Sequence, residues 1–201
     1  MTFWGVVVAA GSGRRFGGAK HEQLLGDRPL WQWARDAVAD AGAAGVVVVG
    51  DLPGGVPGGK RRRDSVAAGL AQVPKAAALV LIHDAARPLA SADLARRVVA
   101  RLEAGDVDGV VPALPVRDTL KRAADGSVLE TISRNGLVAA QTPQGFRADV
   151  LRRAHEASDE DASDDALLVE RMGGVVATVP GEPANLKVTY RDDLATLAAM
   201  I

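Results

Sequence analysis

The sequence predicts an α/β fold of the Rossmann-like kind, in which helices flank a mostly parallel sheet. Uncharged, β-branched runs such as residues 6–8 are typical of strands that are buried on both faces of such a sheet. These runs alternate along the chain with segments of helical periodicity, which indicates repeated βαβ units. The alternation stops after Pro115, where a polar hairpin pattern predicts a protruding β-hairpin arm for dimerisation.

The first half of the chain supplies most of the predicted sheet. We expect buried strands at residues 6–8, 45–49, 78–82 and 109–113. Apolar residues recur at helical spacing over residues 30–42, in a short segment that ends near residue 73 and over residues 91–104, where Ser91 is the expected N-cap. Ligands bind outside the carboxyl ends of the strands in such sheets, so the loop after residue 8 and the loop at Asp84 should share one rim.

The second half begins with the hairpin arm, about residues 116–134. Polar and apolar residues alternate on both sides of Asp125-Gly126, a dipeptide typical of tight hairpin turns. A two-stranded hairpin this polar is not stable alone, so we expect the arm to lie on its own domain or on a partner chain. The remaining expected elements are strands at residues 137–141 and 175–179, helices at 147–157, after 165 and at 193–200, and a short edge segment at 185–189.

Composition predicts a globular protein with a single domain over residues 1–201. Hydrophobic residues make up 48% of the chain and charged residues 24%, which suffices for a substantial core. The net charge of −1 gives no overall field that would favour nucleic acid or membrane surfaces as partners. The sequence has no cysteine, which excludes disulfides, thiolate metal sites and a cysteine nucleophile. Because neither a signal-peptide pattern nor an apolar run of about 20 residues occurs, we expect a cytoplasmic location.

The loop after the first strand carries the pattern Ala9-Ala10-Gly11-x-Gly13-x-Arg15. Its alanines and glycines leave the backbone bare, so main-chain N–H groups can approach a ligand closely. Arg14, Arg15 and Lys20 add three cations without an acidic residue to neutralise them. Such a loop suits a polyphosphate, and it resembles the signature loop of nucleotidyltransferases that make sugar and polyol nucleotides. A glycine-rich turn with solvated arginines is the simpler alternative.

Two other phosphate-binding loops fit less well. The P-loop pattern requires Lys-Ser/Thr directly after its last glycine, but Ala19 follows Gly18 and His21 stands where the hydroxyl should be. The dinucleotide fingerprint has Phe16 in place of its third glycine. An NAD(P)-dependent oxidoreductase is therefore a less favoured alternative, which binding of NAD(P)H would revive.

The sequence shows no covalent nucleophile and no metal-binding cluster, since His21, His83 and His155 lack the spacing of zinc ligands. This suits a reaction whose attacking group is itself a phosphate, because a phosphate monoester is already anionic at neutral pH. The difficulty is then the repulsion between two anions. Cations, oriented N–H groups and Mg²⁺ reduce that repulsion.

Motifs spread over nearly the whole chain resemble those of the 2-C-methyl-D-erythritol 4-phosphate cytidylyltransferase family of the non-mevalonate isoprenoid pathway. Besides the loop pattern and Lys20, they are Gly59-x-x-Arg62-x-x-Ser65-Val66, His83-Asp84-Ala85-Ala86-Arg87-Pro88, Pro115-Val116-Arg117-Asp118-Thr119-x-Lys121, Arg134-Asn135-Gly136-Leu137, Thr142-Pro143-Gln144-x-Phe146, Ser163-Asp164-Asp165-Ala166 and Asn185-x-Lys187-Val188-Thr189. One of these motifs alone is weak, but all of them in the family's order form a specific signal.

The resemblance implies that CTP and 2-C-methyl-D-erythritol 4-phosphate react to give 4-diphosphocytidyl-2-C-methyl-D-erythritol and pyrophosphate, with Mg²⁺ bound mainly through the CTP phosphates. The implied nucleotide-binding residues are Ala9, Ala10, Gly11, Gly13, Gly59 and Ser65, the last two reading cytosine. The implied catalytic residues are Arg15, Lys20, Arg134 and Lys187. The implied polyol-phosphate residues are Asp84, Arg87, Thr119, Arg134 and Lys187. Thr119 and Arg134 would reach the partner subunit's site from the arm, which makes the protein a homodimer.

Two alternatives stay open beside this interpretation. A ribitol or other pentitol 5-phosphate cytidylyltransferase has a similar fold and CTP loop, so only the polyol pocket separates the two. A catalytically silent interaction domain would release no pyrophosphate with any nucleotide. The chain also departs from the family pattern around Lys20, because Ala19 precedes it, His21-Glu22 follows it, and the loop from Arg15 is short.

Overall fold

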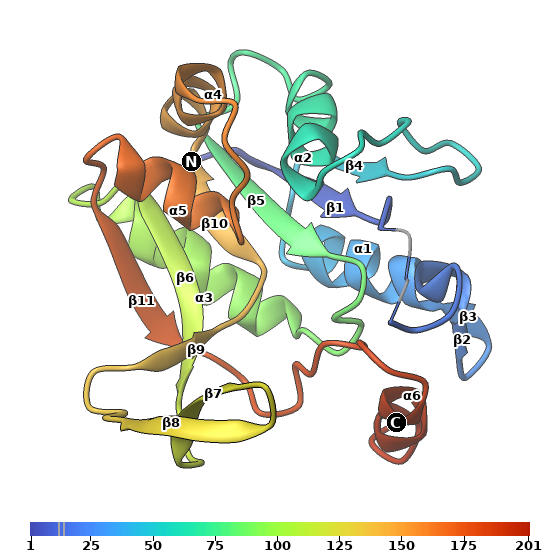
Figure 1. Cartoon of the computed structure of the whole chain (residues 1–201). Helices are drawn as coiled ribbons and strands as arrows, with labels where there is room; N and C mark the ends of the chain where they lie inside the picture. Colours follow the sequence, from blue (N-terminus) through green and yellow to red (C-terminus); the bar gives the residue numbers. More distant parts are fainter. Residues whose placement is uncertain (12, 14) are drawn as a thin grey trace.

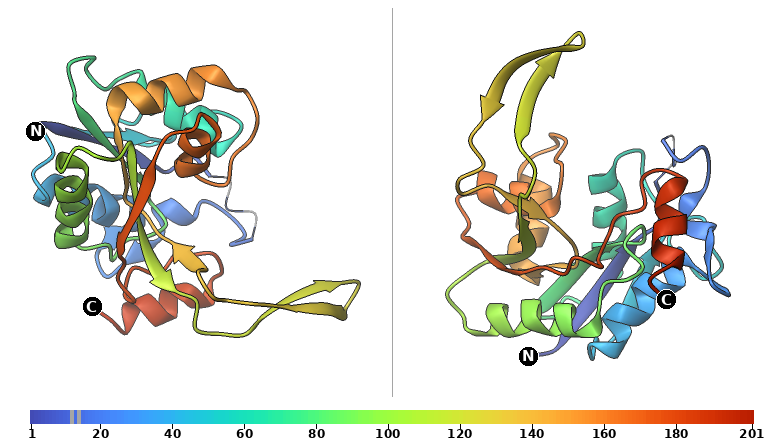
Figure 2. Two further views of the ribbon diagram at one scale, coloured as in Figure 1. Left: turned by 90° about the vertical axis from the view of Figure 1, so that its left-hand side faces the viewer. Right: turned by 90° about the horizontal axis from the view of Figure 1, so that it is seen from below.

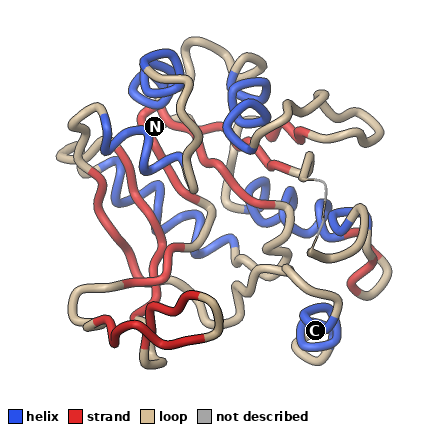
Figure 3. Tube along the Cα trace, in the orientation of Figure 1, coloured by secondary structure: helices blue, strands red, loops and turns tan. Residues whose placement is uncertain are grey.

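The computed structural model describes residues 1–11, 13 and 15–201, and within them helices cover both faces of a central sheet (Figures 1 and 3). The central strands are β1 (Phe3–Val8), β4 (Val46–Val49), β5 (Leu79–Asp84), β6 (Gly109–Pro115), β9 (Val138–Ala140), β10 (Gln144–Arg147) and β11 (Val176–Pro180). The helices are α1 (Leu30–Asp40), α2 (Arg62–Leu70), α3 (Ala92–Glu103), α4 (Ala148–Ala157), α5 (Asp165–Arg171), α6 (Asp192–Ala198) and the short 3-10 helix η1 (Lys20–Glu22). Two small hairpins complete the chain, β2 (Leu24–Leu25) with β3 (Arg28–Pro29) and β7 (Leu120–Ala124) with β8 (Ser127–Ile132).

The central sheet is mostly parallel, as the sequence predicts. Its strands follow the order β11-β6-β10-β5-β1-β4, and β9 also pairs with β6. Strand β1 is parallel to β4 and β5, and β6 is parallel to β11. Strands β10 and β9 run antiparallel to their neighbours.

Strand β10 lies between β5 and β6. The sequence pattern predicts no strand here, because it marks residues 142–146 as a motif that follows a strand, and the structure corrects this. The β10 residues Gln-Gly-Phe-Arg carry no alternating pattern that would predict a strand. Packing decides here instead: Phe146 is fully buried, and a Cβ on Gly145 would lie 2.5 Å from Cγ1 of Val98 in α3. Glycine thus allows α3 to pack closely against a strand that local pattern does not mark.

Strand β5 shows why both faces of the sheet are covered. Leu79 and Leu81 belong to a core cluster that α1 and α3 close, whereas Val80 and Ile82 belong to the opposite cluster, which α2, α4 and α5 close. All four side chains are fully buried, as expected for an uncharged run between two helical layers. Among the described residues, no helix combines the length and the apolar character that a membrane crossing needs.

The carboxyl ends of β1 and β5 lie side by side, which confirms the predicted shared rim. Their parallel register pairs Val8 with Asp84. The Ala85 N–H also donates a hydrogen bond to the Val8 carbonyl (3.0 Å). The loop that begins at Ala9 therefore starts directly beside the loop that follows Asp84.

The predicted hairpin is present and extends away from the sheet and its helices (Figure 2). Asp125 and Gly126 have φ values of 49° and 78°, and tight two-residue hairpin turns require such positive values. Most of β7 and β8 is exposed, and the apolar side chains of Val128 and Leu129 are 63% and 62% exposed. In a single chain the arm therefore presents apolar side chains to solvent.

The prediction of a short edge strand at residues 185–189 is wrong. We call this segment the strap. The strap is irregular, and its hydrogen bonds join the loop after β5 instead of a strand ladder. The Val188 N–H donates to the Ala86 carbonyl (2.8 Å), and the Arg87 guanidinium donates to the Asn185 carbonyl (2.8 Å). These bonds carry the strap across the rim where β1 and β5 end.

Ser91 caps α3 as predicted, and its removal should lower stability. Its Oγ accepts a hydrogen bond from the Leu94 N–H (3.0 Å) and donates one to the Glu182 carboxylate (2.6 Å). We expect Ser91→Ala to lower the free energy of unfolding by about 1–2 kcal/mol, the usual range for a lost N-cap, in urea titrations followed by circular dichroism. The exposed Ser127→Ala is the control, and an unchanged midpoint for Ser91→Ala would contradict the importance of the cap.

Candidate active site

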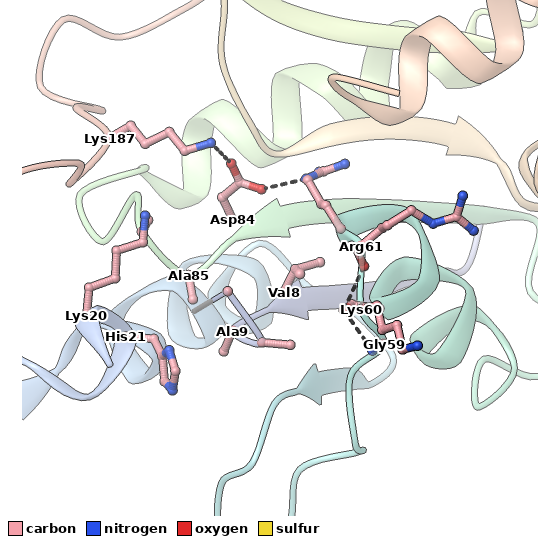
Figure 4. A pocket seen from close by; sticks show the side chains of 15 residues that line it. Val8, Ala9, Lys20, His21, Gly59, Lys60, Arg61, Asp84, Ala85 and Lys187 are labelled. Atoms are coloured by element: carbon pink, nitrogen blue, oxygen red, sulfur yellow. Dashed lines mark hydrogen bonds and ion pairs between the residues drawn. The ribbon is translucent and has the colours of Figure 1, made fainter. Parts of the chain in front are cut away.

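Two adjoining hollows lie on the rim formed by β1 and β5. The larger hollow has a volume of about 470 Å³, within the range of small-molecule sites (Figure 4). It is lined by Val8, Ala9, Ala10, Gly11, Lys20, His21, Gly59, Lys60, Arg61, Arg62, Ser65, Asp84, Ala85, Ala86 and Lys187. The smaller hollow, about 210 Å³, is lined by Arg62, Asp84, Arg87, Ala140, Gln141, Thr142, Gln144, Ser163, Asp164 and Lys187. Arg62, Asp84 and Lys187 line both hollows and form the wall that they share.

Small residues from two loops form one side of the larger hollow. Ala9, Ala10 and Gly11 line it after β1, and Gly59 lines it before α2. The two loops pack closely, because a Cβ on Gly58 would lie 2.2 Å from the Cβ of Ala10. The structure thus brings together four of the predicted nucleotide-binding residues. Gly11 and Gly59 are exposed, whereas Ala9 is buried and its N–H donates to the Val49 carbonyl.

Ser65 connects the second of these loops to α2. It is buried, and its Oγ accepts a hydrogen bond from the Gly59 N–H (3.1 Å) and donates one to the Arg61 carbonyl (3.3 Å). The hydroxyl therefore fixes the conformation of the Gly59 loop at the edge of the hollow. Its predicted contact with cytosine stays a prediction.

Gly13 and Arg15 lie outside the lining of the larger hollow. Gly13 has a φ of 59°, and a Cβ there would lie 1.8 Å from the Gly18 carbonyl oxygen, so this turn requires glycine. Arg15 is exposed, and Arg14 lies outside the described residues. The predicted roles of Gly13 at the nucleotide and of Arg15 in catalysis stay predictions.

Lys20 reaches the larger hollow from η1. Its Nζ donates a hydrogen bond to the Val188 carbonyl of the strap (3.0 Å). Burial lowers the pKa of Lys20, and the nearby ammonium of Lys187 lowers it further. The preceding loop is anchored by Phe16, which is buried in a cluster with Leu25 and neighbouring apolar residues. Lys20 is therefore a partly buried cation that a polyphosphate in the hollow would stabilise.

Asp84 stands at the centre of the shared wall. Its Oδ2 accepts a hydrogen bond from Lys187 Nζ (2.7 Å; Figure 4), and its Oδ1 accepts one from Arg62 Nε (3.2 Å). Burial alone would raise the pKa of Asp84, but the Arg62 guanidinium and the Lys187 ammonium outweigh it and hold the pKa far below its ordinary value. Asp84 is therefore ionised, and two cations compensate its charge.

Arg87 is a cation that lines the smaller hollow but not the larger one. Its guanidinium donates to the Asn185 carbonyl (2.8 Å) and the Ala140 carbonyl (3.2 Å), both of them neutral acceptors. Burial lowers the pKa of Arg87, although Asp84 partly offsets this effect. Neutral carbonyls do not neutralise the guanidinium, so its positive charge is available to an anion that binds in the hollow. A guanidinium also binds phosphate oxygens well.

His83 supports the rim from inside the core. It is fully buried, and burial lowers its pKa to about 4, so the imidazole is neutral. Its Nδ1 lies 2.8 Å from Thr142 Oγ1, which also accepts the Asp84 N–H (3.0 Å). Asn185 Nδ2 donates to the Thr142 carbonyl (2.8 Å), so Thr142 connects β5 with the strap.

Thr119 and Arg134 lie on or beside the arm, outside both hollows of their own chain. Both are exposed, and Arg134 donates a hydrogen bond to the Arg117 carbonyl. Arg134 also lines a separate, open hollow at the base of the arm. One chain alone does not bring these two residues to the site, and their predicted reach into a partner's site stays a prediction.

Comparison with known proteins decides the family. The profile of the 2-C-methyl-D-erythritol 4-phosphate cytidylyltransferase family, IspD, matches residues 3–201. The chain belongs to this family. The resemblance stated from the motifs is therefore confirmed, and the α/β fold with its mostly parallel sheet matches that of solved IspD structures.

Relatives with known names agree with this assignment. The bifunctional enzyme IspD/IspF of Solidesulfovibrio magneticus is 46% identical over 98% of this chain and 57% of its own length. The enzyme of the same name from Anaeromyxobacter dehalogenans is 44% identical over 98% of this chain and 56% of its own length. The chain thus spans a little over half the length of these curated relatives. The 2-C-methyl-D-erythritol 4-phosphate cytidylyltransferase structure from Thermus thermophilus has a TM-score of 0.82 and 34% identity, covering 97% of this chain and 96% of that one.

Sequence reasoning assigned no role to several residues that the structure places at the site. Arg62 appeared only as a motif match, yet it lines both hollows. Gln144 donates to Asp164 Oδ2 (2.8 Å), and both line the smaller hollow with Ser163. Their place in motifs shared with the family was the one available signal, because the contacts themselves join segments far apart in the chain.

Proposed function

We propose that the chain joins CTP and 2-C-methyl-D-erythritol 4-phosphate to give 4-diphosphocytidyl-2-C-methyl-D-erythritol and pyrophosphate, in isoprenoid precursor biosynthesis. The observation that carries this proposal is the shared wall of Arg62, Asp84 and Lys187 between two cation-lined hollows. Membership of the IspD family supports the same reaction and favours it over the nicotinamide-dependent alternative. The expected cytoplasmic location stays a prediction.

In this proposal CTP occupies the larger hollow and the polyol phosphate occupies the smaller one, beside Arg87. A phosphate oxygen of the polyol phosphate attacks the α-phosphorus of CTP, the bond from this phosphorus to the oxygen bridging to the β-phosphate breaks, and pyrophosphate leaves. Lys20 and Lys187 would stabilise the negative charge that grows on the reacting phosphoryl group, and Arg15 would approach from the loop. The charge of Asp84 is already compensated, so it can orient Lys187 without repelling the substrates.

Mg²⁺ would be held mainly by the CTP phosphates. Among the described residues, no group of three or more His, Cys, Asp or Glu is placed to hold a metal ion. Asp84 is the one described carboxylate in the larger hollow, and both of its oxygens already accept from Arg62 and Lys187. This donor set fits an ion that arrives on the triphosphate, a common arrangement for magnesium. When bound, the ion would neutralise part of the triphosphate charge.

We also propose that the protein is a homodimer through the arm. Val128, Leu129 and Val138 are exposed apolar side chains on or next to the arm, and burial against a second copy would remove them from water. Thr119 and Arg134 lie outside both hollows of their own chain, so a two-fold pair could supply them to each other's site. Each active site would then contain residues from both chains.

A pyrophosphate-release assay tests the proposed function. CTP, UTP, GTP and ATP are each offered with methylerythritol phosphate and with ribitol 5-phosphate. We expect turnover with CTP and methylerythritol phosphate to exceed that with UTP at least about 100-fold, because a site that hydrogen-bonds one base leaves polar groups unpaired with another. Faster turnover with ribitol 5-phosphate would instead identify a pentitol phosphate cytidylyltransferase. No release with any pair would contradict nucleotidyl transfer.

A further inference from the structure

A continuous row of alternating charges runs from α5 to the strap. Asp165 Oδ2 accepts a hydrogen bond from Arg62 Nη1 (2.6 Å), and Arg62 Nε donates to Asp84 Oδ1 (3.2 Å). Lys187 Nζ donates to Asp84 Oδ2 (2.7 Å), and His155 Nε2 lies 3.1 Å from Asp165 Oδ1. The row therefore begins in the core and ends at the wall between the two hollows.

Asp165 differs from the other acidic member in its surroundings. Its side chain is 1% exposed, and it lines neither hollow, whereas Asp84 lines both. Burial would raise the pKa of Asp165, but the Arg62 guanidinium and the hydrogen bond with His155 together outweigh it and hold the pKa below its ordinary value. The hydrogen bond to Arg62 is the side-chain contact that joins Asp165 to the lining of both hollows.

The guanidinium of Arg62 is planar, so its contacts are not independent. Nη1 is held by Asp165 on one side, which fixes the plane and directs Nε toward Asp84. Asp84 then has one oxygen engaged by Arg62 and the other turned toward Lys187. Stability alone gives a weak reason for such a row, because apolar packing usually stabilises a core as well as a buried ion pair does.

We propose that Asp165 is a positioning residue, which holds Arg62 so that Asp84 and Lys187 keep the orientation needed at the junction of the two substrates. This inference rests on the proposed function, and it extends that function to a residue that touches neither substrate. Substitution of Asp165 should therefore change the orientation of Asp84 and not the stability of the fold.

The test is a double-mutant cycle on kcat/KM for methylerythritol phosphate, with CTP saturating. The variants are Asp165→Asn, Asp84→Asn and the double variant. Asp165→Asn has nearly the same shape as the native residue but removes the charge that holds Arg62. We expect it to lower kcat/KM about tenfold, the scale of a hydrogen bond to a charged group, with an unchanged KM for CTP.

The cycle separates positioning from a structural role. If Asp165 acts through Asp84, Asp165→Asn causes no further loss in the Asp84→Asn background, because the group that it positions is already changed. Losses that multiply, or a rise in the KM for CTP together with a lower melting temperature, would overturn the inference. Asp106→Asn is the matched control, since Asp106 forms an exposed pair with Arg101 away from the site.

A variant that does not fold has a substitute, and two further outcomes are decisive. Should Asp165→Asn not fold, the cycle is run with Asp165→Glu, which keeps the charge and displaces it by one methylene, and the same non-additive pattern is expected. Native activity in a folded Asp165→Asn variant, beside an active native protein, would overturn the inference and leave the proposed function intact. An inactive native protein would overturn the proposed function and this inference with it.

Discussion

Lys20→Ala and Arg15→Ala should each lower kcat at least about 100-fold, the scale for removing one oriented charge contact from an enclosed site. Lys20 has the clearer structural basis. It lines the larger hollow, and its Nζ is held by the neutral Val188 carbonyl, so the charge is available to a phosphate. Arg15 is exposed, so its effect requires the loop to bring it to bound CTP.

Steady-state pyrophosphate release measures both variants. Lys75→Ala is the matched control, because Lys75 is exposed and lies in neither hollow. Native kcat in both the Arg15 and the Lys20 variants would mean that the loop after β1 does not carry the reacting phosphates. A loss with Lys20→Ala alone would place the catalytic charge in η1 and remove Arg15 from the proposed mechanism.

Activity should return when inactive Arg134→Ala subunits are mixed with inactive Arg15→Ala subunits. In a two-fold dimer whose arms exchange, each heterodimer has one site with both substitutions and one site with neither. Random exchange would make about half of the dimers mixed, so the mixture should regain about a quarter of the native activity.

The assay needs proof that subunits have exchanged, for example by mass spectrometry of differently tagged chains. Mixing Lys20→Ala with Arg15→Ala subunits is the control, because both residues belong to the same chain's loop and no native site can form. Exchange without recovery in the first mixture would show that Arg134 serves its own chain or no site at all.

The rim of the fold was predictable because its signals are local. The β-branched run that ends at Val8 and the run that ends before Asp84 both mark buried strands, and parallel topology then brings their carboxyl ends together. The turn at Asp125-Gly126 was equally visible, since both residues adopt positive φ with little strain. Local sequence patterns were therefore enough to predict where the larger hollow and the arm lie.

The contacts inside the site were not predictable in the same way. Arg62 and Asp165 are separated by 103 residues, and no local pattern says that one faces the other. Strand β10 was missed for a related reason. The close packing of α3 against the strand requires glycine at position 145, and strand propensity does not. Where packing between distant segments decides a position, a single sequence shows only the residue type.

The neutral imidazole beneath the rim links folding to acidity. An unfolded chain protonates His83 near pH 6.5, whereas the folded chain resists protonation until about pH 4. Between these values the unfolded state binds the extra proton, so stability falls as the solution is acidified, by on the order of 3 kcal/mol in total from this group. Above pH 6.5 both states are neutral and the contribution vanishes. The histidine that supports Asp84 from within thus sets a lower limit to the pH at which the rim persists.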